Sequence, residues 1–260
     1  MTWLNLDQKV IIVTGGKSGI GATLKAALEK ENAVVLSLDK AYSKQTESEY
    51  PCDITNQKEV ETCIQTIYQN YGHIDALINN AGMSLPRLLV DVKNPHSKFE
   101  MSEDFFDQIF SINVKGTFFC TQAVARYMTS QKQGVIINVS SECGKEGSFA
   151  QSAYSATKGA IESFTRSWAK ELGAYNIRVI AIAPGPIEAT NLWSNTYKEG
   201  MKYCRNTTLE EVRANYKTAS LLRREGKLTE IADTILFLLS DHAGYITGTT
   251  INVSGGKSRG

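Results

Sequence analysis

The sequence predicts an α/β fold in which a single doubly wound parallel sheet of about seven strands is flanked by helices. Short, continuously apolar runs of strand length recur along the chain, and stretches with helical periodicity separate them. This alternation is typical of βαβ units. The 260 residues, 42% of them hydrophobic, are enough for one domain with a large core. We therefore expect one domain over residues 1–260.

Composition excludes several classes of protein. A net charge of +1 provides no overall field for nucleic acid or an anionic membrane. No apolar run reaches the roughly 18 residues of a membrane span, and the first residues lack the features of a secretory signal. Five scattered cysteines without a C-x-x-C pair indicate neither a disulfide framework nor a zinc site. We expect a cytoplasmic protein without a bound metal.

The first apolar run, 9–14, leads directly into a glycine-rich turn at 15–21, and a helix is expected over 22–29. Glycines permit a tight turn and a close approach of the backbone, and the N-terminus of the following helix presents free N–H groups to a diphosphate. The order of strand, glycine turn and helix predicts a dinucleotide site. Its expected contacts here are Gly15, Lys17, Ser18, Gly19, Ile20 and Gly21.

The second apolar run, 33–38, ends at Asp39. In dinucleotide-binding folds, a carboxylate here accepts hydrogen bonds from the ribose of NAD and repels the 2′-phosphate of NADP. Lys40 and Lys44 follow closely and would soften that repulsion. The alternative is an aspartate in a turn at the end of a strand. We expect NAD to be the cofactor.

Two further strands are expected beside this site, over 50–54 and at the start of 76–82. Asp53 either meets the adenine or caps the helix expected over 56–71. The amides that end the second strand are suited to satisfying backbone groups beside a ligand. The expected cofactor contacts in these stretches are Asp53, Ile54, Asn80, Ala81 and Gly82. Residues 83–102 are expected to form loops.

Two helical stretches are expected within 103–131, and Asn113 between them either bends the helix locally or is a plain buried amide. The strand that follows, 134–141, delivers Ser141 at its C-terminal end. Ligands gather at this edge of open α/β sheets. Ser141 is therefore a candidate for holding a hydroxyl or carbonyl oxygen of a substrate.

A helix expected over 152–175 places Tyr154 and Lys158 one turn apart on the same face. A phenol is a weak acid, with a pKa of about 10, and a nearby ammonium group favours the phenolate. A pKa lowered by about two to three units would make Tyr154 a proton acceptor near neutral pH. The pair therefore predicts general acid/base chemistry.

A strand over 178–183 ends in a Pro-Gly-Pro turn, and a polar and aromatic insertion follows over about 187–227. Insertions of this length are usually lids or binding loops, and we expect this one to bind substrate. A helix over 230–240 and a strand over 249–253 complete the predicted fold.

Together these motifs resemble the short-chain dehydrogenase/reductase family from about Lys9 to Gly256. The matching positions are 14–21, 79–82, Asn113, Ser141, Tyr154 with Lys158, and Pro184 with Gly185. The resemblance implies a Rossmann-type sheet of seven parallel strands, a nicotinamide cofactor and a catalytic tetrad. It implies that Asn113 holds a water of the proton relay and that Ser141 positions the substrate oxygen. It also implies that Tyr154 is the acid/base and that Lys158 lowers its pKa and binds the nicotinamide ribose.

Further cofactor contacts and a homotetramer are also implied by the resemblance. The contacts are Tyr154, Lys158, Pro184, Gly185 and Ile187. Ser18 stands where members that use NADP often have a basic residue, in agreement with Asp39. One departure is Thr190, which lies one place later than the threonine that usually follows the Pro-Gly pair.

A closer resemblance is to family members that interconvert D-sorbitol 6-phosphate and D-fructose 6-phosphate with NAD, and it rests on 164–173, 183–188 and 255–260. A phosphate needs a local cationic pocket, for which the candidates are Lys145, Arg205, Lys257 and Arg259. The expected substrate contacts are Ser141, Glu142, Tyr154, Lys145 and Arg205. The Glu142 carboxylate either faces sugar hydroxyls or points to solvent. The alternatives are another polyol or a 3-oxoacyl thioester as substrate, and a dinucleotide-binding redox sensor without turnover.

Overall fold

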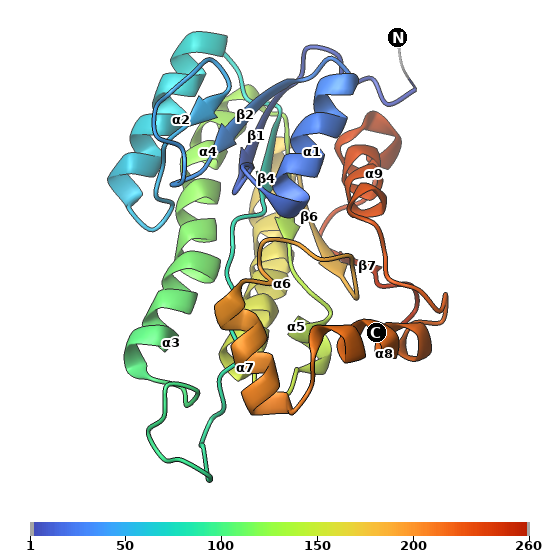
Figure 1. Cartoon of the computed structure of the whole chain (residues 1–260). Helices are drawn as coiled ribbons and strands as arrows, with labels where there is room; N and C mark the ends of the chain where they lie inside the picture. The colour runs from blue at the N-terminus through green and yellow to red at the C-terminus, as the bar shows by residue number, and fades with distance from the viewer. Residues whose placement is uncertain (1–2, 259–260) are drawn as a thin grey trace.

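The computed structural model describes residues 3–258, apart from the side chains of Leu209 and Lys217. Within this part of the chain, a seven-stranded sheet forms the centre, in the order β3-β2-β1-β4-β5-β6-β7 (Figure 1). Neighbouring strands all pair in parallel, which confirms the predicted fold class. The strands are β1 (Val10–Thr14), β2 (Val34–Leu38), β3 (Glu49–Tyr50), β4 (Ala76–Asn79), β5 (Gly134–Val139), β6 (Ile177–Pro184) and β7 (Thr250–Val253).

Helices cover both faces of the sheet. The helices of the described chain are α1 (Gly19–Lys30), α2 (Gln57–Tyr71), α3 (Glu103–Phe110), η1 (Ser111–Gly116), α4 (Thr117–Gln131), α5 (Cys143–Glu146), α6 (Ser152–Leu172), η2 (Gly173–Tyr175), α7 (Asn195–Arg205), α8 (Leu209–Ala219), α9 (Leu228–Leu239) and η3 (Asp241–Ala243). α2, α4 and α6 contribute to the core on one face, and α1 and α9 to the core on the other. No helix of the described residues is both long and apolar enough to cross a membrane.

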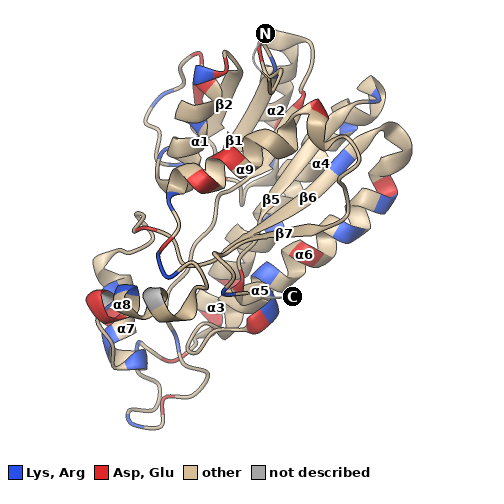
Figure 2. Ribbon diagram, turned by 90° about the vertical axis from the view of Figure 1, so that its right-hand side faces the viewer, with Lys and Arg blue, Asp and Glu red and all other residues tan. Residues whose placement is uncertain are grey.

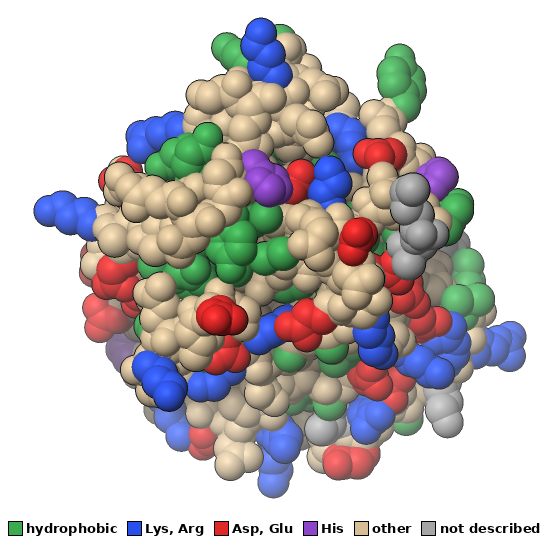
Figure 3. Space-filling view, turned by 90° about the horizontal axis from the view of Figure 1, so that it is seen from above, with side chains coloured by type: hydrophobic (Ala, Val, Ile, Leu, Met, Phe, Trp, Pro, Cys, Tyr) green, Lys and Arg blue, Asp and Glu red, His purple; other side chains and the backbone are tan. Residues whose placement is uncertain are grey.

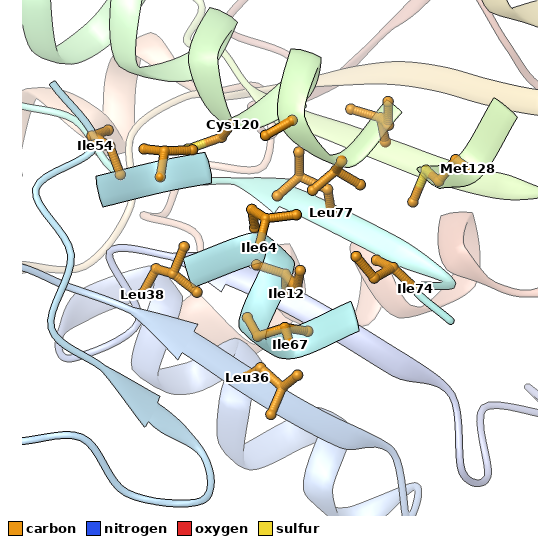
Figure 4. Packing of buried hydrophobic residues seen from close by; sticks show 14 of the residues in the cluster. Ile12, Leu36, Leu38, Ile54, Ile64, Ile67, Ile74, Leu77, Cys120 and Met128 are labelled. Carbon is orange, nitrogen blue, oxygen red and sulfur yellow. The ribbon is translucent and has the colours of Figure 1, made fainter. Parts of the chain in front are cut away.

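Successive residues of a strand enter the two cores alternately. Ile12 of β1 packs with Leu77 of β4 and with Ile64 of α2, as Figure 4 shows. Its neighbours Ile11 and Val13 belong to the other core. Because both faces are buried, the strands are continuously apolar and do not alternate with polar residues.

The strand order reverses between β1 and β4, and this reversal positions the site. β1 pairs with β2 on one side and with β4 on the other, so Val13 lies beside both Ser37 and Ile78. The connections leave these strand ends in opposite directions, which opens a crevice at the C-terminal edge of the sheet. α5, α7 and α8 lie beyond the same edge (Figure 1).

Several element boundaries differ from the prediction. β3 ends at Tyr50 instead of continuing to residue 54, because Pro51 has no backbone N–H to continue the ladder. α1 begins at Gly19, inside the glycine turn. The predicted insertion contains two helices, α7 and α8, and α8 begins with a capping box between Thr208 and Glu211.

Candidate active site

A cavity of about 690 Å³ follows the C-terminal edge of the sheet from the glycine turn to the insertion. The predicted cofactor residues that line it are Gly15, Ser18, Gly19, Ile20, Asp39, Asp53, Ile54, Asn80, Ala81, Gly82, Tyr154, Lys158, Pro184, Gly185 and Ile187. The predicted substrate residues that line it are Ser141, Glu142, Tyr154 and Arg205. The fold thus brings most of the candidates together.

Three predicted contact residues lie elsewhere. The Lys17 ammonium turns to the main-chain oxygen of Ala41. Gly21 packs beneath the turn, where a Cβ would collide with the main-chain oxygen of Gly15. Lys145 is exposed on α5 and is not among the residues that line the cavity. The structure therefore does not place Lys145 where the predicted contact with substrate needs it.

The glycine turn brings the ends of β1 and β4 close together. Gly15 has a φ of +66°, and a Cβ there would lie 2.9 Å from the Cα of Ala81, so a larger residue would be strained and crowded. Asn80 fastens the junction by donating from Nδ2 to the main-chain oxygens of Thr14 at 3.0 Å and Gly15 at 3.1 Å. The N-terminus of α1 adjoins the cavity with the positive end of its dipole. These features fit the diphosphate of a dinucleotide.

Asp39 is held at the cavity wall by the backbone. Its carboxylate accepts hydrogen bonds from the N–H groups of Lys17 at 3.2 Å and Ala41 at 2.9 Å. Each carboxylate oxygen has further lone pairs for donors in the cavity. The arrangement fits the hydroxyls of a ribose.

Asp53 also lies at the cavity wall and does not cap α2. It accepts from the backbone N–H of Thr55 at 2.9 Å and from its hydroxyl at 2.8 Å. Asn56 is the N-cap, and its side chain accepts from the first turn of α2. The helix-cap alternative for Asp53 is therefore wrong.

Ser141, Tyr154 and Lys158 converge in the middle of the cavity. The Ser141 hydroxyl lies near the Tyr154 phenol and accepts from the backbone N–H of Cys143 at 3.3 Å. The Lys158 ammonium is buried, lies 5.7 Å from the centre of the Tyr154 ring and donates to the main-chain oxygen of Val139 at 2.7 Å. A hydroxyl, a phenol and an amine therefore meet where the two ends of the cavity join.

The electrostatics of this centre differ from the prediction. Burial raises the pKa of Tyr154 above its ordinary value, and the nearby Ser141 hydroxyl offsets only part of this increase. Burial also lowers the pKa of Lys158 to about 8. The predicted lowering of the Tyr154 pKa by Lys158 is wrong for this structure, because desolvation outweighs an amine that is bonded to Val139 and not to the phenol.

Asn113 lies in the π-helix η1 and is buried there. Its Oδ1 accepts from the N–H of Met83 at 2.8 Å, and its Nδ2 donates to the Met83 oxygen at 3.0 Å and to the Thr157 hydroxyl at 3.1 Å. The sequence allowed Asn113 to disturb the helix locally or to be a buried amide, and the structure shows both, since the helix is widened into a π-helix and the amide is buried. The side chain ties the loop after β4 to α6, and its predicted role in holding a water stays a prediction.

The end of the cavity beyond Tyr154 is lined by polar and aromatic side chains from segments far apart in the sequence. Among them are Ser84, Ser148, Gln151, Trp193, Tyr197, Tyr216 and Lys257, of which only Lys257 was a sequence candidate. Gln151 donates to the hydroxyls of Ser84 at 2.8 Å and Tyr197 at 3.3 Å. The available signals were the place of Gln151 just before α6 and the aromatic content of the insertion.

Glu142 faces the cavity rather than solvent. Only 8% of the residue is exposed, and its carboxylate pairs with Lys257 from the C-terminal segment. Lys257 also lies 3.7 Å from Glu146. Burial raises the pKa of Glu142, and the Lys257 ammonium counteracts that increase. Arg259, the other sequence candidate from this segment, lies outside the described residues.

The opposite end of the sheet has a different character. A smaller cavity of about 320 Å³ lies there, and charged residues of both signs line it. Lys9 and Asp75 in its wall form an ion pair at 3.2 Å. Seen from above, this end of the molecule mixes basic, acidic and histidine side chains without a patch of one sign (Figure 3). The larger cavity is therefore the better candidate for the active site.

Comparisons with known proteins agree with this geometry. The family model described as short chain dehydrogenase matches residues 9–200. Sorbitol-6-phosphate 2-dehydrogenase of Klebsiella pneumoniae is 49% identical and covers 100% of this chain and 99% of its own length. A 3-oxoacyl-(acyl-carrier-protein) reductase of Thermotoga maritima is 36% identical, with 97% of this chain and 99% of its own length covered.

A solved structure shares the whole fold. The ligand-free aldohexose dehydrogenase of Thermoplasma acidophilum superposes with a TM-score of 0.85 at 27% identity, and the match covers 100% of this chain and 98% of that one.

Proposed function

Since the chain belongs to the short-chain dehydrogenase family and is an oxidoreductase, we propose that it interconverts D-sorbitol 6-phosphate and D-fructose 6-phosphate with NAD. The observation that carries the proposal is the meeting of Ser141, Tyr154 and Lys158 between a glycine turn suited to a dinucleotide and a polar end suited to a polyol. The Klebsiella pneumoniae relative, 49% identical, supports the choice of substrate.

The residues of the chain would supply the acid/base chemistry of this reaction. A nicotinamide cofactor, when bound, exchanges a hydride with the substrate. In alcohol oxidation, the Ser141 hydroxyl holds the reacting oxygen and Tyr154 takes its proton; in ketone reduction, Tyr154 returns a proton to that oxygen. Lys158, which is buried one helical turn after Tyr154 and lines the same cavity, would hold the ribose of the nicotinamide.

NAD rather than NADP is proposed on account of Asp39. Its carboxylate is fixed by two backbone N–H groups at the cavity wall. A 2′-phosphate at the same place would meet a fixed negative charge. The side chain at position 18, where a basic residue would favour that phosphate, is a serine.

The polar character of the substrate end favours a sugar over an acyl chain. Glu142, Gln151 and Tyr197 present a carboxylate, an amide and a hydroxyl to it. A 3-oxoacyl thioester, the substrate class named for the Thermotoga maritima relative, would place an apolar chain beside Glu142 Oε2, which has no hydrogen-bond partner among the described residues and is costly to leave unpaired in a buried site.

The test is the initial rate of NADH oxidation with fructose 6-phosphate and with fructose, each repeated with NADPH. We expect a strong preference for the phosphorylated ketose and for NADH. Equal rates with both sugars would contradict the sugar phosphate as substrate. Turnover of acetoacetyl thioesters but not of fructose 6-phosphate would support the acyl alternative, and cofactor binding without any turnover would support a sensor.

A further inference from the structure

We propose that Arg205, the last residue of α7, binds the phosphate of the substrate and thereby orients the sugar with its ketone toward Tyr154. This inference rests on the proposed function, because it assumes a phosphorylated substrate. It selects Arg205 from the basic residues that the sequence offered as candidates for binding the phosphate.

The guanidinium of Arg205 retains unused donors. Its Nη2 donates to the Ser148 hydroxyl at 2.8 Å, the Phe149 main-chain oxygen at 2.5 Å and the Gln151 side-chain oxygen at 2.7 Å. Its Nε is buried without a partner, and its Nη1 bonds to no described residue. Because Arg205 lines the cavity, the N–H groups of its Nη1 are suited to oxygens of a phosphate.

Other cations near this end of the cavity are already neutralised or lie off it. Lys257 is shared between Glu142 and Glu146. Lys145 is exposed on α5 away from the cavity. Arg205 forms no ion pair with any carboxylate of the described residues.

Two other arginines of the insertion have carboxylate partners that Arg205 lacks. Figure 2 shows basic and acidic residues close together along the ribbon of α7 and α8. Arg213 of α8 pairs with Glu225, and Arg224 pairs with Glu230 at 2.6 Å. A dianionic ligand would give Arg205 the negatively charged partner that carboxylates give to these two arginines.

The contacts of Arg205 also connect it to the catalytic centre. Gln151, which accepts from Arg205, lies immediately before α6 and donates to Ser84 and Tyr197. Tyr154 follows in the first turn of the same helix. A phosphate held by Arg205 would thus be fixed relative to the phenol, so binding energy at the phosphate is available to align the reacting carbon.

The experiment compares Arg205→Met with Lys202→Met, an exposed lysine on the same helix, for NADH oxidation with fructose 6-phosphate and fructose. We expect Arg205→Met to lower kcat/KM for fructose 6-phosphate by about 30-fold or more, with fructose turnover changed only a few-fold. Calorimetric titration should show the same loss of fructose 6-phosphate affinity. Lys202→Met should match the wild type with both sugars.

Because Arg205 also ties α7 to residues 148–151, Arg205→Lys is the second variant. It keeps the charge but lacks the planar fork, and we expect an intermediate loss with the phosphorylated sugar. If both variants keep the wild-type preference for fructose 6-phosphate, the role of Arg205 is overturned while the proposed function stands. If the wild type itself shows no such preference, both the proposed function and this inference are overturned.

Discussion

The two ends of the active-site cavity are built in different ways. At the nucleotide end, main-chain groups and short side chains at the ends of β1, β2 and β4 form the wall, and Asn80 and Asp39 are fixed by the backbone. At the substrate end, side chains from α5, the start of α6, the insertion and the C-terminal segment meet, and networks such as that of Gln151 hold them.

Under the proposed function, the difference follows from what each end would bind. A diphosphate is recognised by backbone N–H groups and a helix dipole, which require a particular turn but few particular side chains. A substituted sugar is recognised by donors and acceptors placed individually, which different loops can supply. We therefore expect cofactor binding to be sensitive to changes of the backbone at the nucleotide end. We expect substrate turnover to be sensitive to changes of charge at the substrate end.

Removal of the Tyr154 hydroxyl tests the point where the two ends meet and has the largest expected effect. Tyr154→Phe retains the ring but loses the acid/base group, so kcat should fall by about 10²–10⁴-fold. Equilibrium binding of NADH should stay close to that of the wild type. Tyr197→Phe, which removes a hydroxyl that accepts from Gln151 at 3.3 Å, is the control and should cost far less. Comparable losses in both variants would show that Tyr154 has no special role.

Alanine in the glycine turn tests the rigidity of the nucleotide end. Gly15→Ala combines a left-handed residue, φ +66°, with a Cβ 2.9 Å from the backbone of Ala81. We expect NADH affinity to fall more than tenfold and stability to fall by about 1–3 kcal/mol. Gly72→Ala is the matched control, since its φ is +75° but nothing lies within 4 Å of its Cβ. Equal NADH affinity in the two variants would contradict a role for close packing at the turn.

Lys158 is buried at a cost in stability. Burial lowers its pKa from 10.5 to about 8, which corresponds to roughly 3 kcal/mol at neutral pH. Lys158→Met should therefore unfold at a higher temperature than the wild type at pH 7 while losing activity. The folded state binds fewer protons than the unfolded chain between pH 8 and 10.5, so the wild type gains stability as pH rises and the gap should narrow by pH 9. A less stable variant at pH 7 would contradict this account.

The sequence predicted the nucleotide end better than the substrate end because the residues of the nucleotide end are close together in the chain. Each strand end and its turn are contiguous in the chain, so the turn at 15–21 could be located from local spacing, although Lys17 and Gly21 do not line the cavity. The substrate end depends on contacts such as Arg205 with Gln151, which no local pattern reveals. The predicted effect of Lys158 on Tyr154 was wrong because a one-turn spacing on a helix does not report desolvation or the competing carbonyl of Val139.

The smallest effect is expected from the ion pair that joins the C-terminal segment to the residue beside Ser141. Lys257→Met would leave the Glu142 carboxylate, 8% exposed, without its cation, and we expect a loss of about 1–2 kcal/mol in the free energy of unfolding at pH 7. The pKa of Glu142 is already raised by burial and would rise further. Since a raised folded-state pKa stabilises the protonated form, the loss should be smaller at pH 5 than at pH 7.

The double variant Glu142→Gln with Lys257→Met separates this charge effect from packing. A neutral amide needs no cation, so the double variant should recover most of the stability that Lys257→Met loses, and its stability should depend less on pH. A loss that persists in the double variant and is the same at both pH values would mean that Lys257 acts through its hydrocarbon chain. Recovery would show that Lys257 sets the charge beside Ser141, a long-range dependence that we do not expect at the nucleotide end.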